Sequence, residues 1–310
     1  MWMIQASDPD GYKEPCFSGT PLNGGACVRI MSVSSADRLR FEVCVDSLES
    51  ALQAQDGGAD RLEVCSSLLY GGGMTPSYGL VKAIRQVCQI PLMIMIRPRV
   101  GDFIYSDTEL EVMEEDIRSF TLLGVEGFVF GVLTPDGEVD RARTQRLVDA
   151  AGSCKVTFHR AFDVTADFVG SYRAVASIPG VNRILTSGLT PKLMDGGLET
   201  LAHCIPQVPE RASSETRTAP QILPGSGINT ETIKNIIQAL WPLGVTEYHL
   251  SGGQVIQRQG SSEAGFIVGR SLREMGMGSS GLWMTQASVL REVRQAAMET
   301  VEDLGDKSSV

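Results

Sequence analysis

The sequence predicts an α/β protein folded as a TIM-like (β/α)8 barrel. From residue 41 onward, eight short runs rich in β-branched residues alternate with stretches of helical periodicity. Successive runs are roughly thirty residues apart, a spacing typical of repeated strand–helix units in a barrel. No G-x-G-x-x-G fingerprint follows the first run, so the sequence disfavours an open sheet that binds a dinucleotide.

The individual elements can be placed in order along the chain. Strands are expected at 41–45, 61–65, 92–97, 127–132, 155–160, 182–187, 221–225 and 246–250. Helical periodicity between the first four strands marks the segments 47–58, 78–87 and 108–124. Ser106 and Glu109 have the spacing of a capping box that opens the third of these helices, and Gly124 stands just past its end.

The expected organisation is a single domain with additions around the barrel. Residues 1–40 are predicted to be an irregular N-terminal extension, and residues 41–253 to form the barrel. Residues 206–220 are expected to be a mobile insertion before the seventh strand. Residues 254–310 are predicted to contain a loop followed by an amphipathic helix at 285–304.

Composition excludes several classes of function. The 310 residues are 43% hydrophobic, which is enough for a large core, and the net charge of -10 offers no basic surface to nucleic acid or anionic membranes. No apolar run has the length that spans a bilayer, and no secretory signal is recognisable, so we expect a cytoplasmic protein. The seven cysteines include no C-x-x-C pair and are expected to be reduced.

Alternation along the strands predicts polar side chains inside the barrel. Phe41, Val43 and Val45 suit packing against helices, which turns Glu42 and Cys44 inward. The same reasoning gives an inward set that is unusually polar for a barrel: Glu42, Cys44, Glu63, Cys65, Arg97, His159 and His249. Because barrels of this kind keep their active sites at the carboxyl ends of the strands, we expect the functional site there.

The tripeptide Glu-Val-Cys occurs twice, ending at Cys44 and at Cys65. The first two strands are neighbours about 4.8 Å apart, so the two thiols can approach each other. Two thiolates can hold a soft ion such as Cu(I), with Met93 and Met95 as additional thioether donors. The alternative is that both cysteines are inert and only line a pocket.

The other inward charges allow acid–base chemistry on an anion. Glu63 and His159 are candidates for the acid and the base, and the alternative is an internal ion-pair network that stabilises the barrel. Small residues follow the seventh and eighth strands, where many barrels bind phosphate, and the segment 96–109 can fold over the barrel mouth. The candidate anion- or ligand-binding residues are Glu42, Arg97, Asp102, Gly225, Ser226, Gly227, His249 and Ser251.

Six segments together resemble one known family. They are "FEVCVDSLESALQAQDGGADRLEVCSSL", "GGGMTPSYG", "MIRPRVGDFIYSDTE", "VTFHRAFD", "RILTSG" and "LPGSGI". In this order they resemble the CutC copper-homeostasis family. The resemblance implies a TIM barrel, Cu(I) binding by Cys44 and Cys65, and self-association as dimers or tetramers. Ser226 stands where the family often has glycine, and Val100-Gly101 replaces two glycines before Asp102.

Two functions therefore stay open at this point. The first is an intracellular copper-homeostasis protein that binds Cu(I) through cysteines at the barrel mouth. The second is a TIM-barrel enzyme that acts by acid–base chemistry on a small anionic metabolite, phosphorylated or carboxylated. Polar strand ends, a phosphate-like loop pair and His159 are more typical of an enzyme pocket than of a surface that transfers a metal.

Overall fold

The computed structural model describes residues 38–208, 219–257, 274–275 and 281–307. Most of the predicted N-terminal extension and most of the predicted insertion at 206–220 therefore lie outside the described residues. Among the helices in the described ranges, none combines the length and apolar character needed to cross a membrane.

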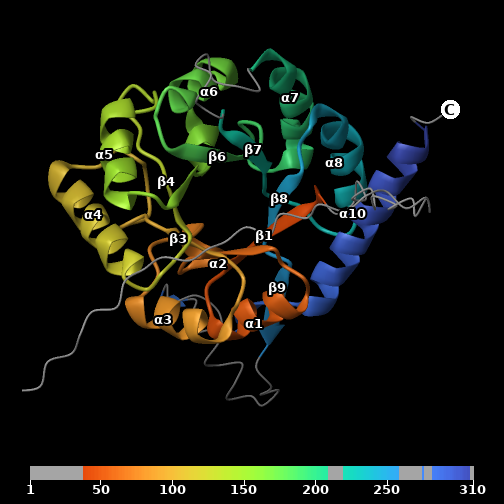
Figure 1. The fold of residues 1–310 in the computed structure, drawn as a ribbon, viewed down its shortest axis with the longest axis horizontal. Helices are drawn as coiled ribbons and strands as arrows, with labels where there is room; N and C mark the ends of the chain where they lie inside the picture. The colour runs from red at the N-terminus through yellow and green to blue at the C-terminus, as the bar shows by residue number, and fades with distance from the viewer. Residues whose placement is uncertain (1–37, 209–218, 258–273, 276–280, 308–310) are drawn as a thin grey trace, which may run out of the picture. The chain divides into compact units, whose positions relative to one another are not determined.

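The strands form the predicted barrel. They are β1 (Arg40–Val45), β2 (Arg61–Val64), β3 (Leu92–Met95), β4 (Gly127–Phe130), β5 (Lys155–Phe158), β6 (Val181–Thr186), β7 (Gln221–Pro224) and β8 (Glu247–Leu250). All pair in parallel, in the order β7-β6-β5-β4-β3-β2-β1-β8. A parallel bridge between Gly225 and His249 joins β7 to β8 and closes the ring, which Figure 1 shows surrounded by helices. The TIM-like fold is confirmed.

Helices follow the strands around the outside of the ring. They are α1 (Leu48–Asp56), α2 (Leu68–Gly71), α3 (Tyr78–Val87), α4 (Asp107–Thr121), α5 (Arg141–Ala151), α6 (Phe168–Ala176), α7 (Gly197–Cys204), α8 (Ile233–Leu240) and α10 (Ala287–Lys307). Short 3-10 turns lie at Arg160–Val164 (η2), Leu193–Asp195 (η3), Ile205–Gln207 (η4) and Trp241–Leu243 (η5). The predicted capping box opens α4, because Ser106 Oγ accepts from the Glu109 N–H at 3.2 Å and the Glu109 carboxylate accepts from the Ser106 N–H at 2.8 Å.

The two faces of the strands bury different kinds of side chain. Phe41, Val43 and Val45 belong to the large apolar core between strands and helices, as the alternation predicts. On the inner face, a separate small cluster consists of Cys65, Met93, Met95 and Val129. The inner face is therefore where polar and sulfur-containing side chains collect.

The chain after β8 contains a hairpin that the sequence reasoning did not anticipate. Strand β9 (Gly253–Gln257) pairs in antiparallel fashion with β10 (Gly281–Thr285). Helix α10 then lies beside α8 (Figure 1), and its Leu290 approaches Gly57 so closely that a Cβ there would stand 2.9 Å from the leucine Cβ. Because Val293 of α10 is also fully buried in the main core, the C-terminal helix supplies the outer helix that follows the eighth barrel strand.

Candidate functional site at the barrel mouth

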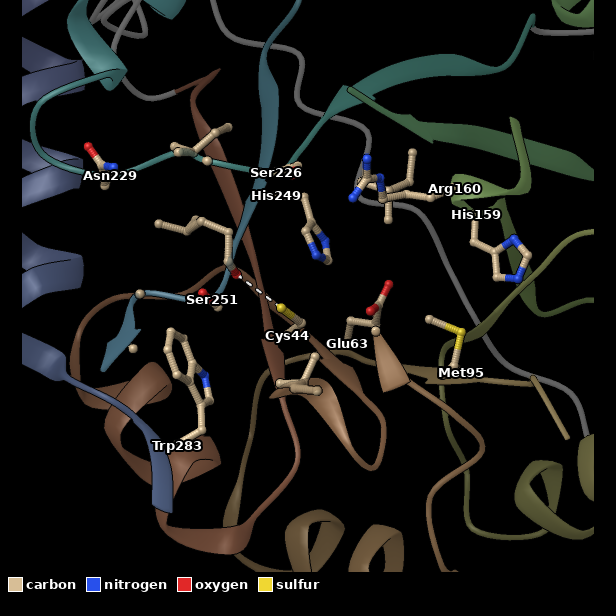
Figure 2. A pocket seen from close by; sticks show the side chains of 18 of the residues that line it. Cys44, Glu63, Met95, His159, Arg160, Ser226, Asn229, His249, Ser251 and Trp283 are labelled. Atoms are coloured by element: carbon tan, nitrogen blue, oxygen red, sulfur yellow. Dashed lines mark hydrogen bonds between the residues drawn. The ribbon is translucent and has the colours of Figure 1, made fainter. Parts of the chain in front are cut away.

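A cavity of about 450 Å³ opens at the carboxyl ends of the strands (Figure 2). Most of the residues predicted from the sequence line it: Cys44, Glu63, Arg97, His159, Ser226, Gly227, His249 and Ser251. Four predicted residues are not part of its lining: Glu42, Cys65, Asp102 and Gly225. The lining residues that the sequence reasoning missed include Arg160, Asn229 and Trp283.

Beneath the cavity lies a continuous chain of buried and half-buried ion pairs. The Glu42 carboxylate accepts from His249 Nδ1 at 2.8 Å and pairs through its other oxygen with Arg61. Arg61 also pairs with Glu247 at 2.8 Å, and Glu247 with Arg183 at 2.7 Å. The internal network considered from the sequence thus exists, but two of its members, Arg61 and Arg183, had not been singled out. The alternation that turns Glu63 and Cys65 inward also turns Arg61 inward, so the sequence could have identified this residue.

The network fixes the charges of Glu42 and His249. Burial alone would raise the pKa of Glu42, but the charges of Arg61 and His249 outweigh burial and lower it to about 2. Burial opposes a charge on His249 as well, yet the nearby Glu63 carboxylate and Cys44 thiol raise its pKa well above the usual value. We therefore describe the pair as a carboxylate and an imidazolium at neutral pH.

Glu63 is buried next to this pair without being part of the network. Its Oε2 atom has no hydrogen-bond partner among the described residues, and the side chain is only 3% exposed. Burial, with help from the charge of Glu42, raises the pKa of Glu63 to about 7 although His249 and Arg61 oppose the rise. One carboxylate oxygen each of Glu42 and Glu63 and one ring nitrogen of His249 all lie within 4.8 Å of one another. The charge of each group therefore affects the ionisation of the other two.

The two predicted metal-binding cysteines occupy different levels of the barrel. The register of β1 and β2 sets Cys44 opposite Glu63, and Cys65 lies two residues farther along the chain, just past the end of β2. Cys44 lines the cavity, where its thiol donates to the Leu250 carbonyl at 3.6 Å and is within hydrogen-bonding reach of His249. Figure 2 shows Cys44, Glu63 and His249 converging.

Cys65 lies just behind the cavity wall. It is fully buried and donates to the Val45 carbonyl at 3.5 Å. A Cβ on Gly73 would lie 3.6 Å from Cys65 Sγ and 3.4 Å from Met95 Cε, so the thiol and the thioether are neighbours under this glycine. Burial, and then the adjacent Glu63, raise the pKa of the Cys65 thiol well above its usual value.

His159 and Arg97 form the opposite wall. His159 begins the short helix η2, and its Nδ1 accepts from the Ala161 N–H at 3.3 Å, which assigns the remaining proton to Nε2. Burial and the charge of Arg97 lower the pKa of His159 to about 3. His159 is thus a neutral hydrogen-bond donor at pH 7, and its role as an acid or base stays a prediction.

Arg97 is held by the segment that follows it. Its Nη1 donates to the Gly73 carbonyl at 3.2 Å and its Nη2 to the Gly101 carbonyl at 3.1 Å, while the guanidinium lies 5.0 Å from the centre of the Phe103 ring. Phe103 also contacts His159 edge-on, with ring centres 4.8 Å apart. The 96–109 segment therefore supports the mouth through Phe103, and its folding over the mouth stays a prediction.

Two predicted ligand-binding residues have structural roles away from the cavity. The Asp102 side chain is 62% exposed and pairs with Arg99 at 3.0 Å, because the arginine three residues earlier is nearer than the barrel mouth. Gly225 lies under the rim, where a Cβ would stand 2.7 Å from Leu185 Cδ1, so its small size serves packing between strands. Ser226 and Gly227, by contrast, line the cavity with φ values of 75° and 84°.

Comparisons with known proteins agree with this architecture. The CutC family model matches residues 39–254. A copper homeostasis protein cutC homolog from Homo sapiens is 42% identical over 217 residues, covering 70% of this chain and 74% of that protein. The homolog of the same name from Dictyostelium discoideum is 37% identical over 268 residues, covering 77% and 91%. A crystal structure from Streptococcus agalactiae, described as a candidate copper homeostasis protein CutC, superposes with a TM-score of 0.61 at 29% identity and covers 69% of this chain and 98% of its own. The chain therefore belongs to the CutC family.

Proposed function

We propose that the protein acts in copper homeostasis by binding Cu(I) at the barrel mouth through Cys44 and Cys65. One observation carries the proposal: a thiol that lines the cavity, Cys44, has a second thiol and the Met95 thioether behind it on adjacent strands. Thiolate and thioether sulfur atoms are the ligands that Cu(I) prefers. The copper-homeostasis names of the relatives support the same assignment.

The charges around Cys44 suit such a site, whereas burial and Glu63 oppose ionisation of Cys65, so the bound ion itself must displace that proton. Both thiols must lose a proton to bind the ion, and an ion held by two thiolates has a net negative charge. The His249 imidazolium touches Cys44, and Arg97 lines the same cavity, so positive charge is available to balance it. Glu63, buried beside both cysteines, is placed to accept a released proton.

An anaerobic titration of reduced protein with Cu(I) against a competing chelator tests the proposal. We expect one tightly bound ion per chain, and more than about 100-fold weaker binding in Cys44→Ser and in Cys65→Ser, since outer partners of metal sites alone contribute 10–100-fold. Cys154→Ser is the matched control, because Cys154 is half-buried and donates to the Val125 carbonyl away from the cavity. Unchanged affinity in the double variant Cys44→Ser/Cys65→Ser would refute the assignment.

A second candidate function, catalysis on a small anionic metabolite, is favoured by a different observation. Glu63 Oε2, His159 Nε2 and Trp283 Nε1 are buried polar atoms of the lining that have no partner among the described residues. Such atoms are uncommon in folded proteins unless a ligand or water completes them. In this reading Glu63 handles a proton, and His159 donates a hydrogen bond to the substrate.

A further inference from the structure

The cavity is cationic although the chain is acidic. The protein has a net charge of -10, yet Glu63 is the one carboxylate among the described lining residues, against two guanidinium groups, Arg97 and Arg160. A concave site lined by one sign of charge concentrates ligands of the opposite sign, so this cavity suits an anion.

Arg160 is positioned by the segments that follow β5 and β6. Its Nε pairs with Asp163 at 2.7 Å, and its Nη2 donates to Ser187 Oγ at 2.6 Å and to the carbonyls of Thr190 and Pro191 at 3.2 and 3.1 Å. These contacts hold the guanidinium at the cavity rim (Figure 2), and within the described ranges Nη1 alone has no protein partner. The arginine is thus oriented in advance with one donor group available.

The unpartnered donor of His159 is an independent sign of a ligand. The side chain is only 3% exposed, it lines the cavity, and its Nε2 atom has no partner in the described part of the chain. Because the Ala161 N–H occupies Nδ1, the Nε2–H is a fixed, neutral donor. A ligand oxygen in the cavity would complete it, whereas a soft metal ion would not.

The rim beside Arg160 offers backbone and a further cation. Ser226 and Gly227 both have positive φ in the turn that follows β7, and main-chain N–H groups in turns can form anion-binding concavities. Lys192 lies against Gly227, where a Cβ would stand 3.5 Å from the lysine Cβ. Arg160 and Lys192 thus bring two positive charges to this part of the rim. Two positive charges favour a ligand with two negative charges over a ligand with a single carboxylate.

We propose that the cavity binds a small phosphate monoester, with its phosphate between Arg160 and the Ser226–Gly227 turn and a hydroxyl or carbonyl oxygen of its body on His159 Nε2–H. The cavity volume of about 450 Å³ accommodates a body of a few carbon atoms beside the phosphate. The inference deepens the enzymatic candidate and rests on it; it does not depend on copper binding.

Calorimetric titration of the reduced, copper-free protein tests this inference. Glycerol 3-phosphate is the probe, with glycerol, inorganic phosphate and glycerate as comparisons. We expect glycerol 3-phosphate to bind at least about 10-fold more tightly than inorganic phosphate or glycerate, and glycerol not to bind. No heat from glycerol 3-phosphate up to about 10 mM, or tighter binding of glycerate, would overturn the proposal.

Variants locate the binding. Arg160→Gln is expected to weaken binding of glycerol 3-phosphate by about 10-fold or more, and His159→Leu by a similar factor, with partial recovery in His159→Gln because the amide restores a donor. Arg143→Gln, which removes an exposed guanidinium paired with Asp107, is the matched control and should not change the affinity. Wild-type affinity in both Arg160→Gln and His159→Leu would refute the proposed contacts.

A second readout covers the case in which Arg160→Gln does not fold. In wild-type protein with ¹⁵N-labelled histidine, the probe should shift the His159 Nε2 resonance and leave Nδ1 nearly unchanged, and an unaffected Nε2 would contradict the proposal. The Cu(I) titration of the same samples separates the two ideas. Copper binding without probe binding removes this inference alone, and probe binding without copper binding removes the copper proposal alone.

Discussion

The barrel interior has charged side chains at two levels, and the two levels differ in how far these side chains are paired. At the lower level, Arg61, Glu42, Glu247 and Arg183 are joined by successive ion pairs. At the mouth, Glu63, His159 and Trp283 each keep a buried polar atom without a partner in the described residues, whereas among the four residues of the lower level Arg183 Nη1 alone does so. Leaving a buried polar group unsatisfied costs about 1–3 kcal/mol. The difference indicates that the lower level serves stability, whereas the mouth is arranged for a ligand.

The largest effect is expected from breaking the lower level. Arg61→Met leaves the carboxylates of Glu42 and Glu247 without their shared cation, and both are buried or nearly so. We expect a loss of about 3–5 kcal/mol in the free energy of unfolding, measured by urea denaturation. Arg143→Met, on the exposed surface, is the control and should have no measurable effect. A loss in Arg61→Met no larger than in the control would mean that the lower level does not stabilise the barrel.

At the mouth, the buried neutral His159 should make the protein sensitive to acid. Its pKa of about 3 in the folded state is below the ordinary histidine value, so the unfolded chain binds a proton first as the pH falls. The stabilisation that neutral His159 gives to the folded state is fully present above about pH 6.5 and is lost as the pH falls toward 3. Between pH 7 and pH 5, wild type should lose about 2 kcal/mol relative to His159→Gln in urea denaturation. Parallel stability curves for the two proteins would contradict this assignment.

Glu63 should produce a smaller dependence in the opposite direction. Its folded-state pKa of about 7 is raised above the ordinary value, so the folded protein holds the proton more tightly. The stabilisation is complete below about pH 4.5 and disappears as the pH rises through 7. Relative to Glu63→Gln, wild type should lose about 1–2 kcal/mol between pH 6 and pH 8. If wild type instead gained stability relative to Glu63→Gln as the pH rose, the Glu63 carboxyl would have to be ionised and paired.

The smallest effect is expected at Asp102, which the sequence suggested as a ligand-binding residue. The exposed side chain pairs with Arg99 and does not line the cavity. Asp102→Asn should therefore leave both the Cu(I) affinity and the glycerol 3-phosphate affinity at wild-type values. A clear loss of either affinity in the titrations described above would show that the 96–109 segment closes over the mouth when the ligand binds.

Alternation along single strands was readable from the sequence and placed much of the site. It predicted the inward position of Glu42 and Cys44 opposite the apolar face of Phe41 and Val43, and the capping box at Ser106 was equally local. The same alternation would also have identified Arg61 as an inward-facing residue. Arg160 was harder to find, because it lies beyond the end of its strand, where alternation no longer applies.

By itself, the sequence thus determined the barrel, its element order and which strand residues face inward, because these depend on periodicity within short segments. Only the tertiary structure decided the partners. The register of β1 against β2 set Cys44 beside Glu63 and moved Cys65 to another level, and closure of β8 onto β1 joined His249 to Glu42. Register and closure depend on contacts between residues as far as 207 positions apart, which no local pattern contains.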